Sequence, residues 1–202
     1  STTVLSPTNS QSSLASKLGG LSSLSSLSSL AGLSLPSVPF TKSEEAIKRI
    51  ESFQFFENQF IPNIKLENLM AVRKWDSKNN KIFYNQNLFD SDSGKWVRNV
   101  SFPKKPEPSA QEAYKIYKKI LNLKENDKTL FVYISIDHQS PVIAQKWVNL
   151  IIENINESMR SIDAKQAQDS IAYLNTAYRS TNFQSIANAI SKLLEKQMQT
   201  LM

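Results

Sequence analysis

Cysteine, histidine and glycine are scarce in this chain of 202 residues, which has no cysteine, one histidine and four glycines. Without cysteine, the chain forms no disulfide, binds no metal through thiolates and has no thiol nucleophile. That absence leaves the redox compartment open, because a reducing cytosol and a disulfide-free periplasm both allow it. None of the glycines lies in the spacing of a dinucleotide- or phosphate-binding loop. We therefore predict that the protein is not an enzyme and has no catalytic residue, no cofactor and no metal.

Apolar stretches long enough to cross a bilayer are also missing, and the first residues do not form a secretory signal peptide. The chain begins at Ser1 in what resembles the middle of a strand. We expect a soluble piece of a larger protein. Its hydrophobic content of 40% is sufficient for a real core in one or two domains.

The formal net charge of +6 raises the question of an acidic partner such as nucleic acid or anionic lipid. The basic residues are dispersed among acidic ones, and the small basic clusters are Lys104-Lys105 and Lys115, Lys118 and Lys119. The sequence contains no motif for binding DNA or RNA. We interpret the clusters as solvated faces and predict no nucleic-acid partner.

The single histidine, His138, follows Asp137 and precedes Ser140 by two residues. A histidine beside an aspartate and a serine is only a weak signal for a nucleophilic catalytic site. Nothing in the sequence supplies an oxyanion hole for it. We expect instead that Asp137 and His138 satisfy backbone groups where a helix begins.

The rest of the chain is organised around the segment from Thr129 to Tyr178. It opens with LFVYISI at residues 130–136, whose β-branched and aromatic side chains predict a largely buried strand. Ser140 then supplies a hydroxyl for an N-cap, and Pro141 suits the first position of a helix. A helix is therefore expected to begin there.

Apolar residues at helical spacing continue from Pro141 to Tyr178 without an intervening glycine or proline. At about 1.5 Å per residue, this helix would be roughly 55 to 60 Å long, which is too long for burial in one compact core. Another helix must cover its apolar stripe. The candidate residues for packing of this helix or for contacts between subunits are Val148, Ile151, Ile155, Met159, Ile162, Ile171 and Leu174.

Residues 182–202 offer a second helix, which carries Ile186, Ile190 and Leu194 at helical spacing. Cap-prone residues at 179–182 allow a turn or a bend between the two helices. Two interpretations remain open. The helices pack locally inside one domain, or they form an extended stalk whose remaining stripe packs on a neighbouring copy of the chain.

The N-terminal part combines a short strand with a segment of low complexity. Residues 1–6, STTVLS, predict a strand that is able to pair with the strand at 130–136. Residues 10–38 are mostly serine, leucine, glycine and alanine, with leucines at every third position that drift around a helix instead of holding one face. We interpret this segment as a mobile loop. The alternative is a sticky segment that a neighbouring subunit or a membrane surface orders.

Two capping boxes, TKSE at 41–44 and SAQE at 109–112, predict the starts of two further helices. The first helix is expected to run to Ile61, because Pro62 disfavours helical geometry at the residue before it. Its apolar side comprises Ile47, Ile50, Phe53, Phe56 and Phe60, and that of the second comprises Ala113, Ile116, Tyr117, Ile120 and Leu121. Polar runs at 76–80 and 90–94 predict turns, and the second run lacks the spacing of a calcium-binding loop.

Several motifs in sequence order resemble the Wzz-type chain-length determinant family, the bacterial polysaccharide co-polymerases. They are KLGGLSSLSSLSSLAGLSL at 17–35, FFENQFI at 55–61, KWD at 74–76, GKW at 94–96, SAQEAY at 109–114, YISIDHQSP at 133–141, AQKW at 144–147, SIAYL at 170–174 and LEKQMQ at 194–199. No single motif is decisive, but their order across nearly the whole chain is fairly specific to that family.

The resemblance implies an inner-membrane protein with a transmembrane helix at each end and a periplasmic domain between them. That domain has an α/β base near the membrane and a long helical arm, and several copies assemble into a ring. The family pattern continues beyond Met202 into a closing base strand and a second membrane helix. The resemblance also implies that the protein regulates the chain length of O-antigen or a related polysaccharide beside the polymerase, without a chemical step of its own.

We therefore predict an α+β fold, with a small α/β base of a few strands and flanking helices and a long α-helical arm that forms a helical hairpin. The base is expected at residues 1–140 and the arm at 141–202. The expected partners are further copies in a homo-oligomeric ring, the polysaccharide polymerase, the growing polysaccharide and the inner membrane, with this chain on its periplasmic face. The alternative function is a coiled-coil periplasmic scaffold or adaptor subunit of an envelope or secretion assembly.

Overall fold

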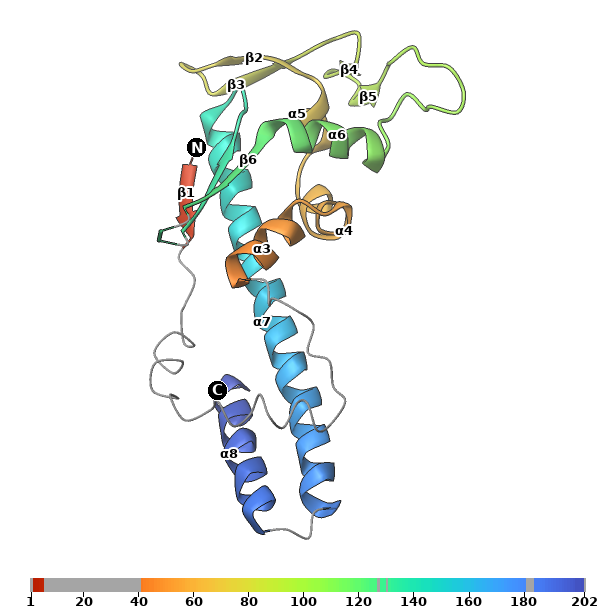
Figure 1. Ribbon diagram of the computed structural model, residues 1–202. Coiled ribbons are helices and arrows are strands. Elements are labelled where there is room, and N and C mark those ends of the chain that lie inside the picture. The colour runs from red at the N-terminus through yellow and green to blue at the C-terminus, as the bar shows by residue number, and fades with distance from the viewer. Residues whose placement is uncertain (1, 6–40, 127, 130, 181–183, 202) are drawn as a thin grey trace. The chain divides into compact units, whose positions relative to one another are not determined.

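The computed structural model describes residues 2–5, 41–126, 128–129, 131–180 and 184–201 (Figure 1). The low-complexity segment at 10–38, for which the sequence predicts a mobile loop, lies outside the described residues. The chain divides into two compact units, residues 1–151 and residues 152–202. The division falls inside one helix, whereas the sequence analysis placed the boundary at residue 140.

A three-stranded antiparallel sheet in unit 1 has the strand order β1-β7-β6. β7 (Val132–Ile136) is the central strand, and its side chains alternate between buried and more exposed. β1 (Thr2–Leu5) pairs with β7, with Thr2 opposite Ser135, so the predicted pairing of these two segments is confirmed. β6 (Leu121–Glu125) pairs with the other edge of β7.

The prediction of one continuous helix from residue 42 to 61 is wrong. α3 (Lys42–Ile50) begins at the predicted capping box of Thr41 and Glu44, but it ends at Ile50. The chain restarts as α4 (Phe53–Phe55), because the Ser52 hydroxyl accepts the Phe55 N–H at 3.1 Å and caps a new helix. A π-helical turn, η2 (Phe56–Phe60), and a 3₁₀ turn, η3 (Ile61–Asn63), follow. The π-helical turn contains Phe56 and Phe60, and both side chains are fully buried.

Two small hairpins follow the short helix α5 (Leu66–Met70). The first joins β2 (Val72–Asp76) to β3 (Lys81–Tyr84), and the second joins β4 (Phe89–Asp90) to β5 (Lys95–Trp96). Both predicted turns are confirmed. Asn80 and Gly94 have φ angles of 48° and 66°, which are left-handed values that asparagine and glycine accommodate best.

α6 (Ala110–Ile120) begins at the second predicted capping box, where Ser109 and Glu112 bond to each other's backbone N–H groups. It ends at Ile120, so Leu121 begins β6 and does not extend the helix as predicted. The alternating residues LNLKE of β6 pair with β7, and this long-range pairing decides their conformation.

The long helix predicted from the second half of the sequence is confirmed as α7 (Pro141–Ser180), which has 40 residues and is about 60 Å long. Ser140 is buried, and its hydroxyl accepts the Ile143 N–H at 3.4 Å, so it occupies the predicted N-cap position. α8 (Gln184–Leu201) is the second predicted helix. Among the described residues, no helix is both long and apolar enough to cross a membrane.

The core of unit 1 is a cluster of aromatic rings. Phe56 lies 4.9 Å from Tyr117 between ring centroids, and Phe60 lies 4.8 Å from Tyr117 and 5.6 Å from Trp147. η2, α6 and the first turns of α7 thereby share one core. The mixture of helices and small antiparallel sheets with a long C-terminal helix agrees with the predicted α+β class.

Candidate functional site

The predicted apolar stripe of α7 divides by burial along the helix. Val148, Ile151 and Ile155 are almost fully buried. The remaining candidates, Met159, Ile162, Ile171 and Leu174, are half-buried. Val148 and Ile151 belong to unit 1, and the other five residues, from Ile155 onward, belong to unit 2. The helix therefore supplies a fully buried segment first and an incompletely covered stripe after it.

Large apolar side chains stay exposed on the helices of unit 2. Tyr173 and Tyr178 are exposed on α7. Met198 is 58% exposed and Leu193 is 42% exposed on α8, and Ile186 and Leu201 are also exposed. Exposed apolar side chains therefore recur on both helices of unit 2.

His138 serves the structure at the entrance of α7. Its Nδ1 accepts the Ser140 N–H at 3.0 Å, its Nε2 lies 2.9 Å from the Asn68 carbonyl oxygen, and its ring lies 4.9 Å from that of Trp147. The expectation that His138 satisfies backbone groups is confirmed. Asp137 differs, because its carboxylate accepts the side-chain amide of Asn122.

Arg98 fastens the loop before α6 to the first turn of that helix. Its guanidinium donates to the carbonyl oxygens of Pro106 and Lys105 at 2.7 and 2.9 Å, and to the Glu112 carboxylate at 3.2 Å. The bonds from Arg98, together with the Ser109 N–H, lower the pKa of Glu112 to about 2. Glu112 thus both closes the capping box and anchors Arg98.

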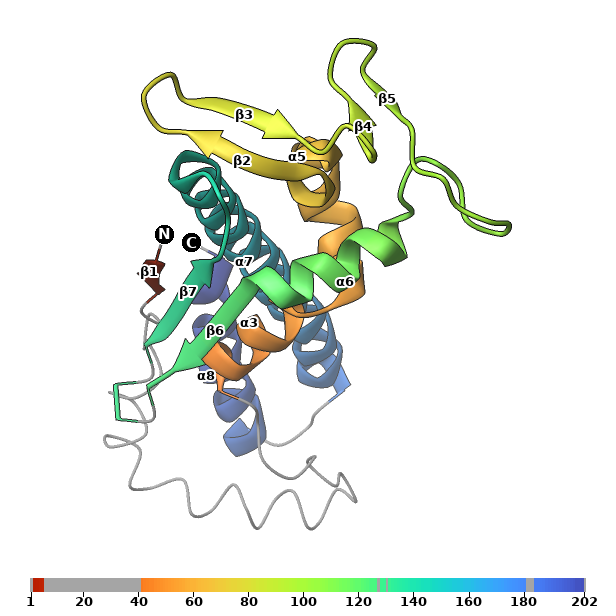
Figure 2. The same ribbon diagram turned by 90° about the horizontal axis from the view of Figure 1, so that it is seen from above.

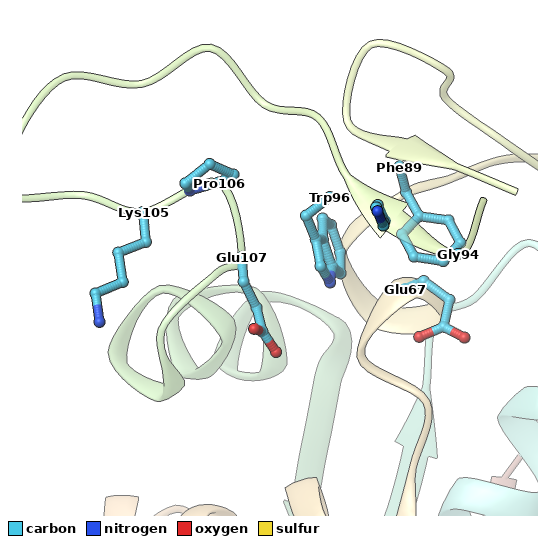
Figure 3. Close-up of a pocket in the computed structure, with 8 residues that line it drawn as sticks. Glu67, Phe89, Gly94, Trp96, Lys105, Pro106 and Glu107 are labelled. Carbon is cyan, nitrogen blue, oxygen red and sulfur yellow. The ribbon is translucent and has the colours of Figure 1, made fainter.

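An open cleft with a volume of about 700 Å³ lies between the second hairpin and this fastened loop (Figure 3). Phe89 and Trp96 form its aromatic part, and their ring centroids are 5.2 Å apart. The other residues that line it are Glu67, Gly94, Lys95, Lys105, Pro106 and Glu107. An aromatic surface between opposite charges suits the binding of an amphipathic molecule.

The turn at 90–94 is held by its own side chains. The Asp90 carboxylate accepts the Ser93 hydroxyl and the Asp92 N–H, and these bonds hold the pKa of Asp90 below its usual value. Within the described parts of the chain, no group of three or more histidine, aspartate or glutamate residues is placed to hold a metal ion.

The sequence analysis missed Arg98 and the cleft. Arg98 and Glu112 are fourteen residues apart, and no local pattern connects them. The tripeptide GKW at 94–96 was a signal for the cleft, because its tryptophan is a large apolar side chain that follows a predicted turn and has few neighbours in sequence to bury it.

Comparison of this chain with protein-family models, with curated proteins and with solved structures finds no match. The resemblance of its motifs to the Wzz-type family therefore stays a prediction.

Proposed function

We propose that the chain is the periplasmic part of a non-enzymatic regulator of bacterial surface-polysaccharide chain length, of the Wzz type. In this proposal unit 1 is the α/β base, and α7 with α8 forms a helical hairpin that serves as the arm. Several copies form a ring beside the polysaccharide polymerase and the growing polysaccharide, on the periplasmic face of the bacterial inner membrane.

The observation that carries the proposal is the helix of 40 residues with an apolar stripe that a single copy does not cover completely. Both helices of unit 2 carry apolar side chains that are incompletely covered: those of the α7 stripe are half-buried, and several on α8 are exposed. Packing against a neighbouring copy would remove this apolar surface from water, which is favourable by about 25 cal/mol for each Å². The motif order from residue 17 to 199 supports the same conclusion.

The proposed mechanism uses geometry instead of a reaction. The aromatic core of Phe60, Tyr117 and Trp147 holds the first turns of α7 within unit 1. In a ring, every copy contributes one such long helix. The assembled helices then define a space of fixed dimensions beside the polymerase, and those dimensions influence when the growing polysaccharide is released.

Deletion of the encoding gene in its bacterium tests the proposal. Surface polysaccharide from the deletion strain, separated by gel electrophoresis, should lose its preferred chain length and show a broad distribution. The wild-type gene supplied on a plasmid should restore the preferred length. The matched control is a plasmid that expresses the same gene with a stop codon before Pro141, which should not restore it.

An unchanged distribution of polysaccharide chain lengths on the gel (the ladder of bands) in the deletion strain would contradict the proposal. If the same strain instead loses a different envelope assembly, the alternative of a coiled-coil scaffold or adaptor replaces it. The two outcomes are separable because the ladder reports polysaccharide length alone, whereas the composition of purified envelope complexes reports the scaffold.

A further inference from the structure

One loop of unit 1 presents an apolar tip to solvent next to two basic residues. The loop joins β5 to α6, and the Lys104 N–H donates to the Ser101 carbonyl oxygen at 3.0 Å, which closes a turn with Phe102 and Pro103 at its centre. Phe102 is 97% exposed, the highest value of any large apolar side chain in the described parts of the chain. Lys104 and Lys105 are exposed beside it.

The loop is held in place on the side that returns to α6. Arg98 donates to the carbonyl oxygens of Lys105 and Pro106 and to the Glu112 carboxylate, so both the strand before the loop and the helix after it fix its position. The Arg98 side chain in this ion pair is only 12% exposed. The loop that carries the exposed Phe102 is therefore held in place by the Arg98 hydrogen bonds.

The same end of unit 1 is basic. Figures 1 and 2 both show β2, β3, β4 and β5 together at this end. Residues 72–107 contain eight lysines and arginines against four aspartates and glutamates, a net charge of +4 out of the +6 of the whole chain. On the first hairpin the basic residues Arg73, Lys74, Lys78 and Lys81 are all exposed.

We propose that this end of unit 1 docks on the surface of an anionic bilayer, with Phe102 inserted among the lipid headgroups. Lysines and arginines near such a surface are attracted by its negative potential, and an aromatic side chain next to them gains by leaving water. The net positive charge of residues 72–107 favours an anionic bilayer over a protein partner, because the whole surface of such a bilayer is negative. This proposal does not rest on the proposed role in polysaccharide length.

Cosedimentation with vesicles tests the proposal directly. The purified chain of 202 residues is mixed at low salt with vesicles of phosphatidylglycerol and phosphatidylcholine, or with vesicles of phosphatidylcholine alone. Binding should occur with the anionic vesicles and weaken with added salt. The substitution Phe102→Ser should reduce partitioning on the order of tenfold, and Lys104→Gln with Lys105→Gln should reduce it to a similar extent.

Matched control variants lie on the helices of unit 2. Tyr173 is 70% exposed on α7, so Tyr173→Ser removes an exposed aromatic side chain from a different surface. Lys165→Gln with Lys192→Gln removes the same charge from exposed positions there. Both controls should bind the vesicles as the wild type does.

Because the chain has no cysteine, a single introduced cysteine is able to carry a fluorophore that reports insertion into the bilayer. Ser101→Cys next to the tip and Gln168→Cys on α7 each provide a single site for a fluorophore that brightens in an apolar environment. Only the probe at 101 should brighten on anionic vesicles, and Phe102→Ser should abolish the change. Equal brightening at both sites, binding that survives the loop substitutions, or equally tight retention by a DNA oligonucleotide would overturn the proposal.

Discussion

Arg98 shows how one side chain joins local and long-range structure in this protein. It follows the strand β5 by two residues, and it binds both the loop before α6 and the carboxylate that caps α6. The loop residues Lys105, Pro106 and Glu107 also line the cleft beside Trp96. One guanidinium therefore positions a wall of the cleft and the support of the exposed Phe102 together.

Neutralising Glu112 should remove a pH-dependent part of the stability of unit 1. Because the folded-state pKa of Glu112 is about 2 and its ordinary value is 4.5, the unfolded chain binds more protons between these values. The contribution is therefore fully present above about pH 5 and is lost as the pH falls toward 2. At pH 7, Glu112→Gln should cost about 1 kcal/mol in the free energy of unfolding.

Urea denaturation followed by tryptophan fluorescence measures this effect, since all three tryptophans lie in unit 1. The stability difference between wild type and Glu112→Gln should narrow from pH 7 to pH 3. The matched control is Glu44→Gln, which changes the glutamate of the other capping box and leaves Arg98 untouched. A difference that stays constant with pH would show that the carboxylate charge of Glu112 contributes nothing.

The hydroxyl of Tyr117 should contribute more to stability than that of Tyr114. Tyr117 is fully buried and donates to the Ile50 carbonyl oxygen at 3.0 Å, and burial raises its pKa. Tyr117→Phe leaves that oxygen without this donor and should cost about 1 to 2 kcal/mol. Tyr114 donates to the Glu51 carbonyl oxygen at an exposed site, where water replaces it, so Tyr114→Phe should cost less than about 0.5 kcal/mol. Equal shifts in the urea midpoint would refute this account of the core.

At the scale of elements, the predictable parts of the fold are those with local causes. The capping boxes at Thr41 and Ser109 and the pair Ser140-Pro141 satisfy backbone groups within one turn, so short sequence patterns identify these helix starts. The break at Ser52 also has a local cause, because the Ser52 hydroxyl accepts the Phe55 N–H and caps a new helix. The strand β6 depends on a distant partner, because pairing with β7 sets its conformation.

The apolar stripe of α7 was likewise predictable only where its cause is local. The spacing of apolar residues identified the stripe of α7, but spacing does not tell how far along the helix other parts of the chain cover it. Val148 and Ile171 have equivalent roles in the pattern, yet the first is fully buried and the second is half-buried. The loop with Arg98 and Phe102 has no periodicity, so only its three-dimensional contacts show its arrangement.

Charges placed on the exposed apolar positions of α8 should weaken assembly without unfolding the helix. Leu193→Lys and Met198→Lys put a lysine where the side chain is already partly in water, and lysine is a good helix former. We expect full-length protein with both substitutions to show a smaller native mass than wild type, with an unchanged circular dichroism spectrum. Gln199→Lys on the same helix is the matched control. An unchanged native mass would exclude these residues from subunit contacts.

For the whole molecule, the proposed function makes the continuity of α7 the essential property. Gln166 is exposed near the middle of the helix. A proline there removes a helical hydrogen bond and introduces a kink at a cost of about 3 kcal/mol or more, whereas an alanine preserves the helix. The core of unit 1 lies before this position, so it should fold normally in both variants.

The most direct test of the account is the chain-length distribution of surface polysaccharide in the deletion strain that expresses Gln166→Pro or Gln166→Ala. The account predicts that the alanine variant restores the preferred length, and that the proline variant, present in normal amount in the membrane, shifts or broadens the distribution. An unchanged distribution from a proline variant whose helix is measurably bent would contradict the claim that the long helix sets polysaccharide length.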